Sequence, residues 1–237
     1  MTPTSGRAVR SSSAVRQDLC DRPGTAQNRP MTTTRLQFAI LAGIAAPIMS
    51  WLLSGVVILS SPGYDPIRQS ISLLANAPLG WLQTVAFVVS GVFGVAWAFG
   101  LGAMLGVTRR QRTIVRVLLL VQAALALGFA IFPTDPARHA VTTIGAVHLV
   151  VFYAYAITMP LTLVALGLVM RRDSWWGRIA TPTLAAGVLL IVSTFLVPLT
   201  VDGPLTPWLG LLERIYVAIP SGWQVGAGVV AWRLARG

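Results

Sequence analysis

Charged residues are scarce in this chain of 237 residues: they make up 11% of it, whereas 55% is hydrophobic. A soluble domain carries about 25% charged residues, so this deficit, with a mean hydropathy of +0.72, places the chain in the membrane class. Cysteine is nearly absent as well. The single cysteine, Cys20, lies in a polar N-terminal stretch, which excludes a disulfide framework, a cysteine-based metal site and a partnered thiol nucleophile.

Lysine is absent altogether, and all 18 basic residues are arginine. A formal charge of +11 would suit a nucleic-acid-binding protein only if the arginines clustered on a soluble face. They lie instead between long apolar runs, so we expect no nucleic-acid partner. The chain also lacks a glycine-rich phosphate loop, a serine nucleophile elbow and a dinucleotide fingerprint, and we predict no cofactor.

Six apolar runs fill nearly everything after residue 35. Each approaches or exceeds the roughly 20 residues that cross a ~30 Å hydrocarbon core. The sequence therefore predicts an all-α integral membrane protein with six transmembrane helices in three helical hairpins. The predicted spans are residues 36–60, 81–107, 113–132, 141–170, 179–200 and 208–232.

Residues 1–35 are rich in Ser, Thr, Pro and Arg and show no apolar periodicity. This composition predicts a disordered cytoplasmic tail ahead of a membrane domain at 36–237. An alternative is that Met31 is the true start, because the first apolar run follows it closely. A cleaved signal peptide is disfavoured, since that run continues to Ser60 without a small-residue cleavage site.

Arginine is distributed unevenly between the two sides of the predicted bundle. Fifteen arginines lie before the first span, after the last, or in the second and fourth connections, whereas only Arg68 and Arg138 lie in the opposite loops. The positive-inside rule then predicts that both termini are cytoplasmic, in a bacterial plasma membrane. The first, third and fifth connections are predicted to lie outside.

Two local patterns refine this layout. In the second run, small residues recur every fourth position, as at Ser90, Gly94 and Ala98, which predicts a close helix crossing. In the first outer loop, Ile67 and Ile71 share one helical face, which predicts a short interfacial helix near residues 66–75.

The outer loops carry repeated aspartates. Asp65 and Asp135 each begin Asp-Pro-x-Arg, with Arg68 and Arg138 as the arginines, and the third loop keeps Asp202 followed shortly by proline. Because aspartate caps helices and proline suits the first helical position, one interpretation is purely structural. The other is that these side chains belong to a binding site on the outer side.

Three ionisable residues, His148, Glu213 and Arg214, fall inside predicted spans, roughly 8 to 10 Å below the outer surface at 1.5 Å per residue. Such groups are costly in lipid and usually face the bundle interior with a partner. Asp135 is the expected partner of Arg214, and His148 or Arg138 that of Glu213. This layer is either a structural ion-pair network or a functional site.

Two other polar features are weaker. Asp135, His139 and His148 supply carboxylate and imidazole groups that can bind zinc, but their spacing matches no zinc signature. A metal site at these residues is therefore a minor alternative. Gln122 lies nearer the cytoplasmic side of its span and is placed outside the charged layer.

Short motifs occur at residues 69–73 (Gln-Ser-Ile-Ser-Leu), at 132–135 (Phe-Pro-Thr-Asp) and at His148. Together they resemble the bacterial and archaeal membrane family catalogued as domain of unknown function 998, over roughly residues 36–235. The resemblance implies the six-span layout and a role for Ser72, Asp135 and His148. It implies no established activity.

Three functions stay open for a membrane protein with an outward-facing polar pocket. A hydrolase-like enzyme would act on a lipid or lipid-linked substrate, with His148 as general base, although membrane hydrolases of this kind need more than two histidines. A small transporter would use the charged layer as part of its path, and a structural protein would use it for assembly. Catalytic candidates are His148, Asp135, Glu213 and Ser72; binding candidates are Asp135, His148, Arg214, Asp65, Arg68 and Arg138. The expected partners are the bilayer and a lipid or small molecule on the outer side, with the oligomeric state left open.

Overall fold

A computed structural model describes residues 33–136, 142–201 and 203–236, which belong to one unit spanning Met31–Gly237. Its elements are α2 (Thr33–Leu59), the 3-10 helix η1 (Ile71–Asn76), α3 (Gly80–Met104), α4 (Arg109–Ile131), α5 (Thr143–Met170), α6 (Gly177–Val201), the 3-10 helix η2 (Thr206–Trp208) and α7 (Leu209–Arg236). Over these ranges the chain contains helices and no strands.

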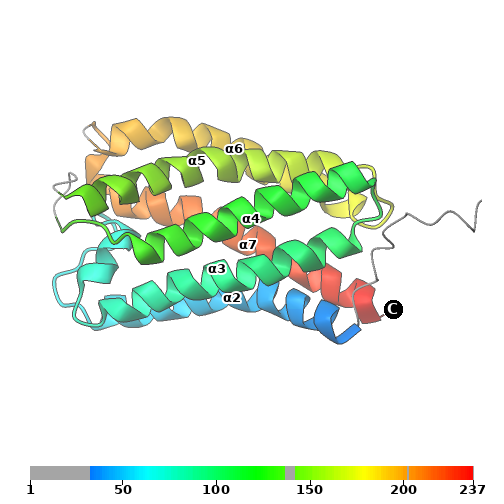
Figure 1. Ribbon diagram of the computed structural model, residues 1–237. Helices are drawn as coiled ribbons and strands as arrows, with labels where there is room; N and C mark the ends of the chain where they lie inside the picture. Colours follow the sequence, from blue (N-terminus) through cyan, green and yellow to red (C-terminus); the bar gives the residue numbers. More distant parts are fainter. Residues whose placement is uncertain (1–32, 137–141, 202, 237) are drawn as a thin grey trace, which may run out of the picture. The chain divides into compact units, whose positions relative to one another are not determined.

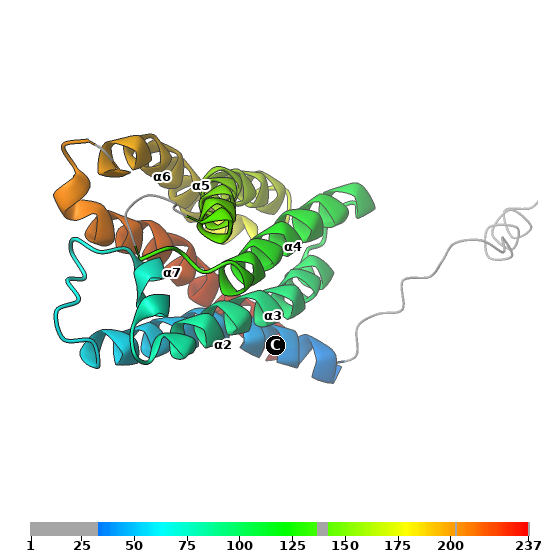
Figure 2. The same ribbon diagram turned by 60° about the vertical axis from the view of Figure 1, so that its left-hand side comes forward.

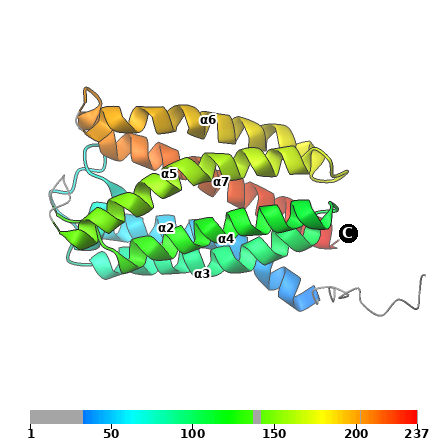
Figure 3. The same ribbon diagram turned by 45° about the horizontal axis from the view of Figure 1, so that its top comes forward.

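The six long helices run back and forth as a bundle (Figure 1). The α2–α3, α4–α5 and α6–α7 connections lie together at one end of the bundle, which we call the loop end (Figures 1 and 3). The start of α2, the end of α7 and the other two connections lie at the opposite end, which we call the terminal end. Figure 2 shows α7 between the α2–α3 pair and the α5–α6 pair.

Five of these helices, α2 to α6, are long and apolar enough to cross a membrane. The chain is therefore a multi-pass membrane protein. The helix α7 is as long as α5, at 28 residues, but carries Glu213, Arg214, Arg233 and Arg236. Its assignment as a sixth span, like the orientation inferred from the arginines, stays a prediction.

Side-chain caps stabilise the N-termini of α4 and α5. Thr108 and Gln111 form a reciprocal capping box at the start of α4, and Thr142 accepts a hydrogen bond from the Gly145 N–H at the start of α5. Before η1, by contrast, the chain makes a turn rather than a helix. The short helix predicted near residues 66–75 is therefore wrong in its bounds, because a 3-10 helix covers only Ile71–Asn76.

Small residues bring helices into contact, as the spacing in the second run predicted. Gly94 of α3 faces Ala123 of α4, and Gly100 of α3 faces Ala39 of α2. Most of the buried apolar cluster then fills the half of the bundle next to the terminal end. Its members there include Ile40, Leu101, Leu105, Val115, Leu166, Met170, Trp176, Ala227 and Ala231.

Asp173 fastens two connections at the terminal end. Its Oδ1 accepts hydrogen bonds from the Trp175 and Trp176 N–H groups, at 2.8 and 3.0 Å, and its Oδ2 accepts one from the Gly106 N–H at 2.7 Å. The α5–α6 connection is thereby joined to the end of α3. The terminal half of the bundle is thus closed by both packing and hydrogen bonds.

Candidate functional site

A cavity of about 300 Å³ lies inside the loop-end half of the bundle. Its lining comes from residues 46–58 of α2, 71–74 of η1, 83–97 of α3, 119–129 of α4, 152–163 of α5, 193–200 of α6 and 209–224 of α7. Because all six long helices contribute from the half nearer the loop end, the cavity reaches about the middle of the bundle. The apolar cluster closes the space beyond.

The cavity wall is mainly apolar, and most of its polar side chains bond to one another or to backbone carbonyls. Ser54 donates to the Gln83 Oε1 at 2.8 Å, and the hydroxyls of Ser50 and Ser90 lie 2.6 Å apart. These pairs join α2 to α3 within the wall. They lower the polarity that the wall presents to the cavity.

Glu213 brings a carboxylate to the loop-end part of this wall. The side chain is half-buried, and its Oε2 accepts a hydrogen bond from the Ile71 N–H at 2.9 Å. Its second oxygen has no hydrogen bond to the part of the chain that the structure describes. Ser72, the next residue of η1, is buried and also lines the cavity, without a side-chain hydrogen bond to any described residue. The two predicted candidates Glu213 and Ser72 therefore share one wall.

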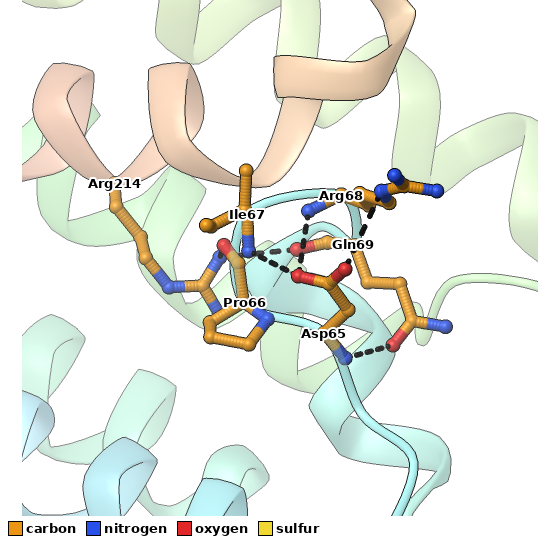
Figure 4. A network of polar contacts seen from close by, with 6 residues as sticks. All are labelled: Asp65, Pro66, Ile67, Arg68, Gln69 and Arg214. Carbon is orange, nitrogen blue, oxygen red and sulfur yellow. Dashed lines mark hydrogen bonds and ion pairs between the residues drawn. The ribbon is translucent and has the colours of Figure 1, made fainter.

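Arg214 fastens the α2–α3 loop to the start of α7 (Figure 4). Its guanidinium donates to the Pro66 carbonyl at 2.7 Å, the Gln69 carbonyl at 3.0 Å and the Gly210 carbonyl of its own helix at 2.9 Å. It also donates to the Tyr64 hydroxyl at 2.6 Å and lies over that ring. Residues 64–70 are thereby held as a strap, the name used below for this segment.

Tyr64 completes the attachment from within the strap. Its hydroxyl donates to the Ser70 and Gln69 carbonyls, at 2.7 and 3.1 Å, while accepting from Arg214. Burial raises the pKa of Tyr64 above its ordinary value, and this effect outweighs the opposing one of the Arg214 charge. The phenol therefore keeps its proton, which it needs in order to donate.

Asp65 and Arg68 have a structural role in the strap. The Asp65 Oδ1 accepts from the Ile67 and Arg68 N–H groups, at 2.9 and 3.3 Å, and its Oδ2 lies 3.5 Å from the Arg68 Nε (Figure 4). Neither residue lines the cavity. Asp65 therefore stabilises a turn, whereas the structural interpretation predicted the start of a helix there.

Asp135 and His148 lie together at the α4–α5 connection but away from the cavity wall. The Asp135 carboxylate accepts from the Thr142 N–H at 3.0 Å and from its hydroxyl at 2.8 Å. His148 is 3% exposed, and its Nδ1 lies 2.7 Å from the Phe132 carbonyl oxygen, with its ring against Phe129. These contacts tie the end of α4 to the start of α5.

Two predicted pairs of the charged layer are wrong, Arg214 with Asp135 and Glu213 with His148. Arg214 bonds to strap carbonyls and the Tyr64 hydroxyl rather than to Asp135, and Glu213 accepts from a backbone N–H rather than pairing with His148. Over residues 33–136, 142–201 and 203–236, the one ion pair is Arg68–Asp65. Arg138, His139 and Asp202 lie outside the described residues, so their predicted roles stay predictions. No cluster of three potential metal ligands occurs within the described ranges.

A family model described as "Protein of unknown function (DUF998)" matches residues 44–230, which is most of the chain. The chain belongs to the DUF998 family. This confirms the resemblance inferred from the sequence motifs, and the match includes every segment that lines the cavity. No curated protein and no solved structure matches this DUF998 chain.

Sequence reasoning about this DUF998 chain missed most of the cavity wall, including Trp97 and Gln122. Both line the wall near its deep end, although Gln122 was placed outside the predicted polar layer. The available signal was an amide in an otherwise apolar span, because a polar group there usually faces the bundle interior.

Proposed function

We propose that this protein is a membrane-embedded binding protein for a small amphiphilic molecule, which occupies the cavity from the extracytoplasmic side. The observation that carries the proposal is an apolar cavity of about 300 Å³ with the Glu213 carboxylate in its wall. This volume is at the lower end of the ~300–1,000 Å³ range of small-molecule sites, which are likewise mostly apolar with a few placed polar groups.

The mixed character of the cavity wall favours an amphiphile. Glu213 and Ser72 offer hydrogen-bonding groups, and aromatic side chains such as Phe87, Phe129 and Phe152 add apolar surface to the same wall. An apolar chain gains by leaving water for such a wall, by about 25 cal/mol per Å² buried. An amine at one end of the molecule would donate to the second Glu213 oxygen.

The loop end is assigned to the outside by the arginine distribution. The terminal end carries the arginines of the α3–α4 and α5–α6 connections and of the end of α7, as the positive-inside rule expects of a cytoplasmic face. The apolar cluster that closes the terminal half argues against a continuous transport path. The position of His148 off the wall, with its Nδ1 at the Phe132 carbonyl, argues against a histidine-based hydrolase.

The proposal is tested with a photoreactive dodecanol analogue added to the purified full-length protein in lipid nanodiscs. Labelled peptides should map to the cavity wall, and Gly55→Leu should reduce the labelling because Gly55 lines the cavity and has open space around its Cα. Gly222→Leu is the matched control, since Gly222 also has open space but does not line the cavity. Labelling spread over the lipid-facing helices and unchanged by Gly55→Leu would overturn the proposal.

A further inference from the structure

Two buried polar atoms at the deep end of the cavity have no hydrogen-bond partner among the described residues: the Trp97 Nε1 and the Gln122 Oε1. Trp97 is 2% exposed and Gln122 is 8% exposed, and both line the cavity. Leaving such a group unpaired away from water costs about 1–3 kcal/mol. Most buried polar groups in proteins are paired, so each of these needs an explanation.

The amide orientation of Gln122 is fixed by its neighbours. Its Nε2 donates to the Thr158 and Thr162 hydroxyls, both at 3.0 Å. Each hydroxyl donates its own proton to the backbone carbonyl four residues earlier, at 2.7 Å. Both threonines can therefore only accept from Gln122. A flipped amide would place an oxygen against two other oxygens, so the Oε1 is left as an acceptor.

Trp97 supplies the complementary group. An indole N–H only donates, and the ring is held against Gly43 of α2. Gly94 of α3 contacts Ala123 of α4, so these two residues lie at the same level along the bundle. From that level, Trp97 is three residues closer to the terminal end along α3, and Gln122 is one residue closer to it along α4. At 1.5 Å per residue their levels along the bundle differ by only about 3 Å. Two cavity-lining residues, one with an unpaired donor and the other with an unpaired acceptor, therefore lie at one depth.

We propose that Trp97 and Gln122 form a deep subsite that binds a neutral hydroxyl group of the ligand. The inference rests on the proposed function and names the ligand class, a hydroxyl-bearing amphiphile whose oxygen reaches mid-bundle. A hydroxyl both donates to the Gln122 Oε1 and accepts from the Trp97 N–H. An ammonium or carboxylate group is disfavoured, because the charged residues of the lining, Glu213 and Arg214, lie near the loop end and leave a charge at this depth unpaired.

The test compares the photoreactive dodecanol analogue with its methyl ether in lipid nanodiscs. The ether still accepts from Trp97 but cannot donate to Gln122, so the wild-type protein should bind the alcohol about fivefold more tightly. Gln122→Met should abolish this preference. A preference that persists in this variant would overturn the subsite, because the alcohol can also donate to the second Glu213 oxygen. Gln83→Met is the matched control, because Gln83 is a buried glutamine of the same wall whose Oε1 already accepts from Ser54. It should keep the preference.

A second variant, Trp97→Phe, tests the same subsite if Gln122→Met does not give a monodisperse protein. Trp97→Phe keeps an aromatic ring and removes the N–H, so it should weaken the alcohol and the ether by a similar factor. Unchanged binding of both probes would overturn the subsite. Equal binding of alcohol and ether by the wild type, with labelling still lost in Gly55→Leu, would also overturn the subsite and leave the proposed function standing. Labelling that is unchanged by Gly55→Leu would overturn both the subsite and the proposed function.

Discussion

Replacing Arg214 by glutamine should release the strap from α7. The guanidinium makes three bonds to the strap, to the carbonyls of Pro66 and Gln69 and to the Tyr64 hydroxyl. Glutamine is shorter and uncharged, so it cannot span these acceptors together. The strap would then keep mainly the bond from the Leu211 N–H to the Ile67 carbonyl, at 2.9 Å, as its link to α7.

The size of the effect follows from these contacts. Hydrogen bonds from a charged donor contribute about 1.5–3 kcal/mol each, and bonds that share one donor group are not additive. A net loss of about 3 kcal/mol is a conservative value for three bonds. Since every 1.4 kcal/mol is a factor of ten, local opening of the strap should become roughly 100-fold more frequent.

Hydrogen exchange at the Leu211 N–H measures this opening, because that amide bonds to the strap and not within α7. Arg68→Gln is the matched control in the same loop. Its ion pair with Asp65 joins side chains that are 71% and 45% exposed, and exposed pairs contribute about 0–1 kcal/mol, or no more than about fivefold in exchange. Equal exchange rates in the two variants would refute the assignment of the strap to Arg214.

Two further predictions concern topology and the α4–α5 connection. In a Cys20→Ser background, a cysteine at Gly63 should react with an impermeant thiol reagent on intact cells while one at Arg110 should not; the reverse pattern would show that the predicted orientation is wrong. Asp135→Ala and Thr142→Ala should each lower the thermal stability of the purified protein, by about 1–3 kcal/mol. Asp135→Ala removes both bonds between the two residues, whereas Thr142→Ala removes the hydroxyl bond to Asp135 and the bond that this hydroxyl accepts from the Gly145 N–H. The double variant should lose less than the sum of the two, and strictly additive losses would contradict the pairing.

The sequence predicted the long helices well because their signal is local. An apolar run long enough to cross lipid must satisfy its backbone internally, so each predicted run corresponds to a helix with similar bounds. The turn that Asp65 stabilises is equally local, because its carboxylate accepts from N–H groups two and three residues later. The 3-10 helix at Ile71–Asn76 was harder to predict, because two isoleucines on one face do not define where a short helix starts.

The partners of the charged residues could not be predicted in the same way. A search for partners in sequence considers side chains of opposite charge, whereas Glu213 accepts from the Ile71 N–H and Arg214 donates mainly to carbonyl groups. Every residue has such backbone groups, so they carry no sequence signal. The sequence predicted a polar pocket, but not the mainly apolar lining of the cavity, because helices that are apolar all round do not reveal which side faces the interior.

The last helix supplies both the Glu213 carboxylate in the wall and the Arg214 side chain that holds the strap. Because the ribosome makes the chain from its N-terminus, α2 to α6 are synthesised before either group exists. Until α7 joins the other helices, the cavity lacks one wall and the strap has no anchor. If the cavity binds a ligand as proposed, uptake would be available only to chains in which α7 has been made, and a ligand present during synthesis would favour the docking of α7 over its release.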